Sequence, residues 1–193
     1  MSIRHRQQKL LDQAGFNIVE LLVVVAVIGV LSAMTIAGFG MAVTGAKADA
    51  AITTALSTLR VARDRAIAER RNFEVRFITP NQIQIVRQEL PVGSGITTVI
   101  SDTYLESGQK FVQVTGVPDT PDAFGGTPPI AFGSATAMMF TSEGTFVNSV
   151  GDPLNGTVFI GVPGQPTSAR AITMLGTTAL VHPWRWDGKR WVD

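Results

Sequence analysis

The stretch that decides the fold is Gly15-Phe16-Asn17-Ile18-Val19-Glu20, together with the apolar run that follows it. No charged residue occurs between Glu20 and Lys47, and the run opens with Leu-Leu-Val-Val-Val-Ala-Val-Ile. Uncharged apolar runs of about 18 residues or more are typical of transmembrane helices. We therefore expect a membrane-spanning helix at this end of the chain.

Glu20 is the unusual residue of this stretch, because it places an ionisable group at the start of the apolar run. A carboxylate inside a bilayer costs about 2.5–3.5 kcal/mol on insertion scales, so such a residue normally has a function and a partner. A simpler interpretation is that Glu20 marks the edge of the membrane. The residues that precede Glu20 argue against that simpler interpretation.

The segment from Ala14 to Leu22 resembles the class III signal of type IV prepilins and type II secretion pseudopilins. In that family a prepilin peptidase cleaves after the glycine, the new amino-terminal phenylalanine is N-methylated, and a nearby glutamate is kept in the membrane. The resemblance implies cleavage between Gly15 and Phe16, with an N-methylphenylalanine at Phe16. It also implies that Glu20 pairs with the terminal amine of a neighbouring subunit during filament assembly.

The first 15 residues are expected to be a leader peptide that is removed. Arg4, Arg6 and Lys9 make the leader basic, and the positive-inside rule then keeps this end in the cytoplasm. The competing interpretation is an ordinary secretory signal peptide that is cut near Ala46. The apolar run disfavours it, because an ordinary signal has an apolar region of only about 7–15 residues.

A single long helix is predicted from Phe16 to about Arg71, since no proline occurs between Met1 and Thr79. Residues 16–46 would form its transmembrane or filament-core half, and residues 47–71 an amphipathic half. In the second half, apolar residues recur at the helical spacings of three and four: Ile52, Leu56, Leu59, Ala62 or Arg63, Ala66 and Ile67. This stripe is expected to pack on a globular domain.

Residues 72–193 are predicted to form that domain, which is periplasmic and rich in β-structure. Phe73, Val75 and Phe77 alternate with charged residues, and Pro80 begins a turn, so a hairpin is expected here. Further strands are expected at 96–100, 111–115, 137–140 and 157–162, followed by a hairpin of 169–175 and 177–182 that turns at Gly176. The sequence thus predicts an α+β, pilin-like fold: a long amino-terminal helix on a carboxyl-terminal antiparallel domain of roughly seven to nine short strands.

Two further stretches are similar to one branch of the family, the GspH/FimT-like minor pseudopilins. They are the Ala- and Arg-rich helix end with its following strand, from Leu59 to Phe77, and the late strands from Phe140 to Leu180. One departure stands out. Members of this branch often carry Gly-Arg-x-Arg in the last hairpin, whereas Gly176 is followed here by Thr-Thr-Ala.

The carboxyl-terminal tail combines aromatic and cationic residues. It contains all three tryptophans of the chain, and its residues of interest are Trp184, Arg185, Trp186, Lys189, Arg190 and Trp191. Three interpretations remain open: a hairpin around Asp187-Gly188 stapled by its tryptophans, an interface with a protein partner, or a surface for single-stranded DNA.

The sequence offers no catalytic centre. It contains no cysteine, its two histidines lie far apart, and it has neither a glycine-rich phosphate loop nor a nucleophile elbow. Asp119, Asp122 and Asp152 lack the spacing of a calcium loop. We therefore expect no enzyme activity, no metal site and no cofactor.

The expected function is that of a minor pilin or pseudopilin, processed by prepilin peptidase and incorporated into, or priming, a type II secretion pseudopilus or a type IV pilus. The resemblance implies a single pass of the bacterial inner membrane, with a periplasmic domain. Its partners would be other pilin subunits and the inner-membrane assembly platform. The alternatives are a DNA-binding minor pilin for DNA uptake, or a tip module that binds an exported protein through the tail.

Overall fold

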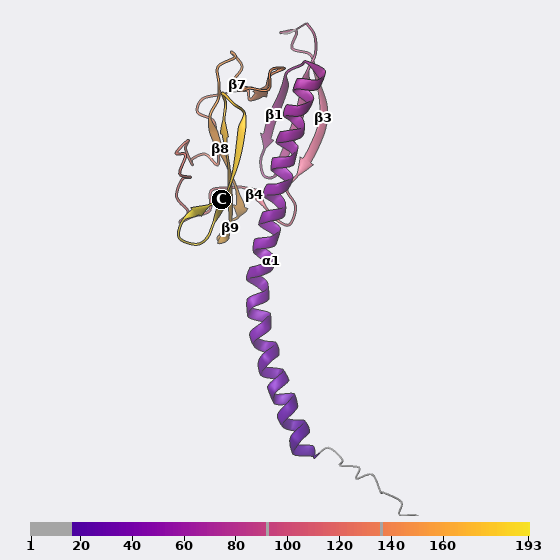
Figure 1. Cartoon of the computed structure of the whole chain (residues 1–193), viewed down its shortest axis with the longest axis vertical. Coiled ribbons are helices and arrows are strands. Elements are labelled where there is room, and N and C mark those ends of the chain that lie inside the picture. The colour runs from indigo at the N-terminus through magenta and orange to yellow at the C-terminus, as the bar shows by residue number, and fades with distance from the viewer. Residues whose placement is uncertain (1–16, 92, 136) are drawn as a thin grey trace, which may run out of the picture. The chain divides into compact units, whose positions relative to one another are not determined.

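The computed structural model describes residues 17–91, 93–135 and 137–193, and it confirms an α+β chain with a carboxyl-terminal antiparallel β domain (Figure 1). The helix α1 spans Ile18–Glu69. The strands are β1 (Phe73–Ile78), β2 (Gln82–Gln88), β3 (Thr97–Tyr104), β4 (Lys110–Phe111), β5 (Ile130–Ala131), β6 (Met139–Phe140), β7 (Phe146–Val147), β8 (Gly156–Val162), β9 (Gln165–Leu175), β10 (Leu180–Trp186) and β11 (Trp191–Val192).

The strands form two sheets, and neighbouring strands within each sheet pair in antiparallel fashion. The first sheet has the order β3-β2-β1-β6-β7; the second has the order β11-β10-β9-β8-β4, with β5 also paired to β8. The chain divides into two compact units between Gly40 and Met41, so the β domain and the second part of α1 belong to one unit. In the part of the chain that is described, no helix combines the length and apolar character needed to cross a membrane.

Both ends of α1 have a local cause. Asn17 caps the first turn, since its side-chain oxygen accepts a hydrogen bond from the Val19 N–H at 3.2 Å. At the other end Arg70 has a positive φ of 50°, and the Arg71 N–H reaches back to the Ala66 carbonyl at 3.1 Å. This is the hydrogen-bond pattern of a Schellman motif. The helix therefore ends two residues before the predicted Arg71; the predicted first residue, Phe16, lies outside the described residues.

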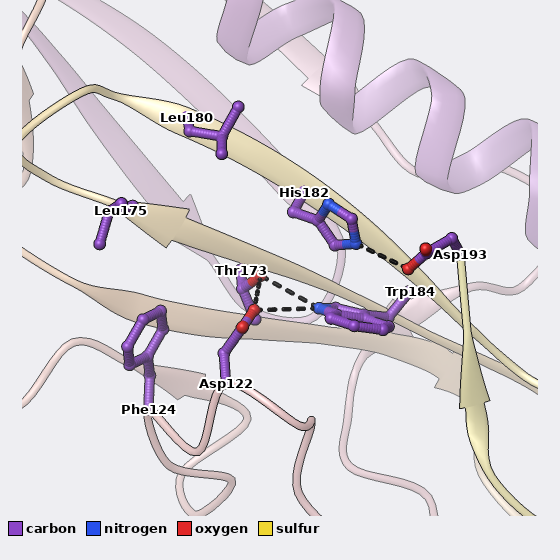
Figure 2. Close-up of a pocket in the computed structure, with 8 residues that line it drawn as sticks. All are labelled: Asp122, Phe124, Thr173, Leu175, Leu180, His182, Trp184 and Asp193. Carbon is purple, nitrogen blue, oxygen red and sulfur yellow. Dashed lines mark hydrogen bonds and ion pairs between the residues drawn. The ribbon is translucent and has the colours of Figure 1, made fainter.

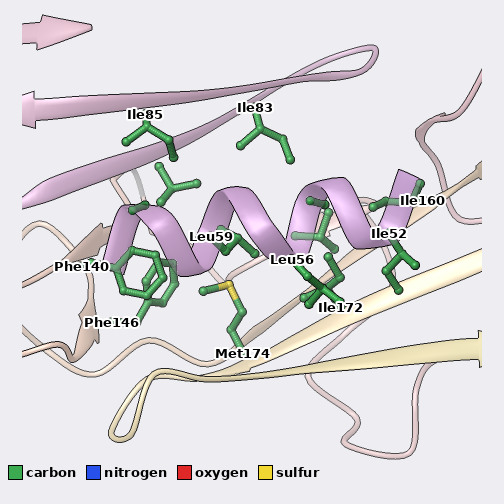
Figure 3. Close-up of a cluster of buried hydrophobic side chains, with 14 of the residues drawn as sticks. Ile52, Leu56, Leu59, Ile83, Ile85, Phe140, Phe146, Ile160, Ile172 and Met174 are labelled. Carbon is green, nitrogen blue, oxygen red and sulfur yellow. The ribbon is translucent and has the colours of Figure 1, made fainter. Parts of the chain in front are cut away.

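The second half of α1 packs on the β domain, as its apolar stripe predicted, and it lies between the two sheets (Figure 3). Its buried residues are Ala51, Ile52, Ala55, Leu56, Leu59, Ala62 and Ala66. They meet Ile83 and Ile85 of β2 on one side and Ile172 and Met174 of β9 on the other. Ile67 was expected on this stripe but is 45% exposed, so the buried stripe ends at Ala66.

The opposite face of the second sheet carries a smaller core. It contains Val114, Val117, Phe159, Ala169, Ala171, Trp186 and Trp191. Because side chains alternate along a strand, Phe159 of β8 faces this small core, whereas Val158 and Ile160 face α1. The second sheet is consequently covered on both faces.

The predicted strand count of seven to nine was too low, because eleven strands occur in the described residues. Five of them (β4, β5, β6, β7 and β11) contain only two residues, which is too short for an alternating pattern to appear in the sequence. The strand predicted at 111–115 is also shorter than expected. It stops at Phe111, and the chain then turns, with the Val117 N–H donating to the Val114 carbonyl at 3.0 Å.

Candidate functional site

The predicted processing pair, Gly15 and Phe16, lies outside the described residues, so only Glu20 of the signal can be placed. Glu20 is exposed in the first turn of α1, where the helix dipole favours a negative charge. Among the described residues, none donates a hydrogen bond to its carboxylate or forms an ion pair with it. Its charge is thus available to a group from elsewhere.

The first turns of α1, on both sides of Glu20, are apolar and exposed. Large hydrophobic side chains there are each at least 50% exposed: Ile18, Val19, Leu21, Leu22, Val23, Val24, Val25, Val27, Ile28, Val30, Leu31 and Met34. They occupy successive positions rather than one stripe, so the helix is apolar on all sides. Helices of this kind are normally covered, either by lipid or by other protein.

The carboxyl-terminal tail forms the predicted hairpin, with Arg185 opposite Val192 and Trp186 opposite Trp191. The Asp187 carboxylate closes the turn by accepting the backbone N–H groups of Arg190 at 2.8 Å and Lys189 at 2.7 Å. Those two hydrogen bonds lower the pKa of Asp187 below its usual value. The hairpin is therefore held by its own turn chemistry.

The three tryptophans have different surroundings. Trp186 and Trp191 are buried, with ring centroids 5.5 Å apart, and the Trp191 indole N–H donates to the Pro118 carbonyl at 3.0 Å. Trp184 is half-buried. The tail thus brings together two core rings and one accessible ring, while its cationic side chains, Arg185, Lys189 and Arg190, are exposed.

A pocket of about 350 Å³ lies beside Trp184, between β9, β10 and the loop that precedes β5 (Figure 2). Its lining residues are Asp122, Phe124, Thr173, Leu175, Leu180, His182, Trp184 and Asp193. The Asp122 Oδ2 atom accepts hydrogen bonds from the Thr173 hydroxyl at 2.5 Å and from the Trp184 indole N–H at 3.2 Å. Sequence analysis did not identify this pocket.

Asp122 lies in an exposed turn, and no local signal in the sequence distinguishes it there. Of the other two acids weighed as calcium ligands, Asp119 instead accepts the backbone N–H groups of Thr120 and Gly125. Asp152 hydrogen-bonds with Asn148. Within the described ranges, no three His, Cys, Asp or Glu residues gather closely enough to hold a metal ion.

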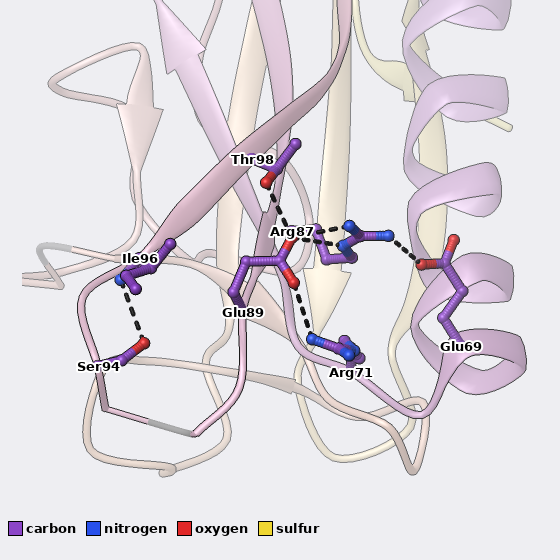
Figure 4. Close-up of polar contacts among 7 residues, drawn as sticks. All are labelled: Glu69, Arg71, Arg87, Glu89, Ser94, Ile96 and Thr98. Atoms are coloured by element: carbon purple, nitrogen blue, oxygen red, sulfur yellow. Dashed lines mark hydrogen bonds and ion pairs between the residues drawn. The ribbon is translucent and has the colours of Figure 1, made fainter.

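A second polar cluster joins the end of α1 to the first sheet (Figure 4). Glu89 lies at its centre and accepts hydrogen bonds from Arg87 at 2.9 Å, Thr98 at 2.8 Å and Arg71 at 2.8 Å. Arg87 also reaches Glu69 at 3.0 Å. The hydrogen bonds from Arg87 and then Thr98 lower the pKa of Glu89. Since every member has a partner within the domain, we assign this cluster a structural role.

Comparison of the chain with family models, curated proteins and solved structures gave no match. Function must therefore be argued from the residues themselves. Two features stand out: the exposed apolar start of α1 with Glu20, and the pocket beside Trp184.

Proposed function

We propose that the chain is a minor pilin or pseudopilin that is incorporated into, or primes, a type II secretion pseudopilus or a type IV pilus. The observation that carries the proposal is the contrast within α1. From Ile18 to Met34 the helix exposes large apolar side chains, whereas from Ala51 to Ala66 it is buried in the β domain.

The exposed half of the helix needs a covering environment. Apolar surface in water costs about 25 cal/mol per Å², so an uncovered apolar helix is unfavourable at every turn. Before assembly the inner membrane would supply the cover, with the β domain on the periplasmic side. In a filament the helices of neighbouring subunits would supply it instead.

Glu20 would favour transfer of the helix from the membrane to the filament. Its carboxylate stands at the start of the apolar stretch, without a partner among the described residues. After cleavage between Gly15 and Phe16, the new amine of a neighbouring subunit would provide the opposite charge. Pairing the two in an apolar surrounding is favourable, because an unpaired buried carboxylate is strongly destabilising.

In the test, the full chain is co-expressed with a prepilin peptidase and a filament-assembly system. Gly15→Val is expected to block cleavage, whereas Glu20→Ala is expected to leave cleavage intact and reduce the amount in sheared filaments by about tenfold or more. Glu143→Gln, which neutralises an exposed acid in a turn of the β domain, is the matched control. Normal incorporation of Glu20→Ala would remove the basis of the proposal.

A second candidate is a DNA-binding minor pilin, which the exposed cations Arg185, Lys189 and Arg190 favour. Trp186 and Trp191 are buried, so such binding would depend mainly on phosphate contacts. Its affinity should then fall steeply as salt is raised. Titration of the chain with single-stranded DNA at two salt concentrations, with and without Lys189→Ala and Arg190→Ala, measures this.

A further inference from the structure

We propose that the pocket beside Trp184 binds an organic cation: a guanidinium or ammonium group on an aliphatic stem, as carried by arginine and lysine side chains or by free polyamines. Its volume of about 350 Å³ falls within the range of ligand pockets, which is about 300–1,000 Å³. The inference rests on the pocket alone and does not depend on filament assembly.

The lining of the pocket is acidic, and its one basic residue, His182, lies beside Asp193. Asp122 and Asp193 both line it, and none of the eight lining residues is a lysine or arginine. The hydrogen bonds to Asp122 come from the neutral donors Thr173 and Trp184, and its Oδ1 atom accepts none from the described residues. An arriving cation would therefore find a carboxylate oxygen that is free to accept a charge-assisted hydrogen bond.

An aromatic surface lies next to that carboxylate. The Trp184 indole is held by hydrogen bonds to Asp122 at 3.2 Å and to Thr173 at 3.1 Å. The His182 ring packs against it at 4.5 Å, and the His182 Nε2 atom lies 3.0 Å from Asp193 (Figure 2). A tryptophan face fixed in this way is suited to a cation–π contact, and it loses little conformational freedom on binding.

The remaining wall is apolar. Phe124, Leu175 and Leu180 line it, and Leu180 is 57% exposed. Arginine and lysine stems cover apolar surface of this kind while their charged ends reach a polar partner. The apolar wall offers no ligand atoms to a hydrated metal ion, and the two carboxylates would repel a phosphate group. The pocket therefore fits an organic cation best.

The test uses the full chain in detergent micelles, labelled with 5-fluorotryptophan. The chain has only three tryptophans, so fluorine NMR gives three signals that single Trp→Phe variants assign. The probes are N-acetylarginine amide, its neutral isostere N-acetylcitrulline amide, and spermidine. We expect the arginine probe to shift the Trp184 signal saturably, with much smaller shifts at Trp186 and Trp191 in the small core.

The variant Asp122→Asn keeps an oxygen that can accept from Thr173 and Trp184 but removes the negative charge. It should weaken binding of the arginine probe by about tenfold, the usual scale of one charge-assisted hydrogen bond. Glu143→Gln removes the same charge at an exposed turn that is not part of the pocket lining and should leave the affinity unchanged. Unshifted Trp186 and Trp191 signals in Asp122→Asn show that the variant is folded.

The probes also distinguish the sources of the cation. Tighter binding of the arginine probe than of spermidine identifies a protein side chain, and the reverse order identifies a free polyamine. Three results overturn the proposal: no saturable shift with either cation, equal binding of the citrulline probe, or unchanged affinity in folded Asp122→Asn.

Discussion

Replacing Asp49 by alanine tests how the β domain holds the helix. Arg170 of β9 faces α1, and its side chain is only 3% exposed. Its guanidinium donates to one charged acceptor, the Asp49 Oδ1 atom, at 2.8 Å. It also donates to three backbone carbonyls, those of Thr167 at 3.1 Å, Ala169 at 2.9 Å and Gly45 at 3.3 Å. In Asp49→Ala the buried cation would keep its carbonyls and lose its counter-charge.

The expected loss of stability follows from these contacts. A hydrogen bond to a charged group contributes about 1.5–3 kcal/mol, and breaking a fully buried pair costs about 3–5 kcal/mol. Asp49 is 53% exposed, so water already screens the pair, and we expect about 2 kcal/mol. Alanine has a better helix propensity than aspartate, which offsets this loss by about 0.5 kcal/mol. The net loss of about 1.5 kcal/mol corresponds to a Tm lower by about 3–6 °C.

Asp64→Ala is the matched control, because Asp64 lies exposed on the same helix and its side chain makes no hydrogen bond or ion pair with the described residues. It should gain about 0.5 kcal/mol from propensity alone. Repeating Asp49→Ala in an Arg170→Met background isolates the pair, since Asp49 then becomes an ordinary exposed acid. There the substitution should behave like Asp64→Ala, giving a coupling energy of about 2 kcal/mol.

The assay is thermal unfolding of the full chain in detergent, followed by near-ultraviolet circular dichroism of the tryptophans, which all lie within 184–191. If Asp49→Ala and Asp64→Ala differ by less than about 0.5 kcal/mol, or if the Arg170→Met background makes no difference, the Asp49–Arg170 pair does not stabilise the domain.

Three further predictions use the same unfolding measurement. Arg70→Gly should raise stability by about 0.5–1 kcal/mol, because glycine adopts the positive φ at the end of α1 without strain; a loss would contradict the assigned cap. Arg87 lowers the pKa of Glu89, so the cluster around Glu89 should stabilise the fold above the unfolded glutamate pKa of about 4.3, and this stability should be lost as pH falls through the lower folded pKa. Glu89→Gln should flatten the dependence of Tm on pH in that range. An unchanged Tm profile would refute the role of Glu89. Gly176→Ala should cost about 1–3 kcal/mol or more, because a Cβ atom there would collide with the backbone nitrogen of Leu154; a stable variant would show that this loop yields easily.

Features encoded by neighbouring residues could be predicted from the sequence. The hairpin of β1 and β2 follows from strict alternation around a Pro-Asn turn, and the final hairpin from Asp187-Gly188. The apolar stripe of the second half of α1 was likewise visible as a helical period. In each case the signal and the structure lie within one continuous stretch of chain, where spacing dictates which side chains share a face.

Contacts between distant residues could not be predicted in the same way. Asp122 and Thr173 are separated by 51 positions and Asp49 and Arg170 by 121. Alternation along β9 places Thr173 and Arg170 on opposite faces, but nothing in the sequence says which loop or helix covers each face. An aspartate in a Pro- and Gly-rich loop is most often solvated, so Asp122 gave no sign that it lies beside Trp184.

The tail shows how far residue type alone can mislead. Interleaved tryptophan and arginine suit DNA, a protein partner or a stapled hairpin equally well, because all three use the same aromatic and cationic groups. The register of β10 and β11 shows the hairpin itself, with Trp186 and Trp191 in the small core and Arg185 outside. Trp184 has the same parity as Trp186, yet it remains accessible, because the loop carrying Asp122 meets it edge-on through the indole N–H instead of covering the ring. Hydrogen bonding by that loop, rather than tryptophan content, therefore distinguishes the half-buried Trp184 from the two buried rings.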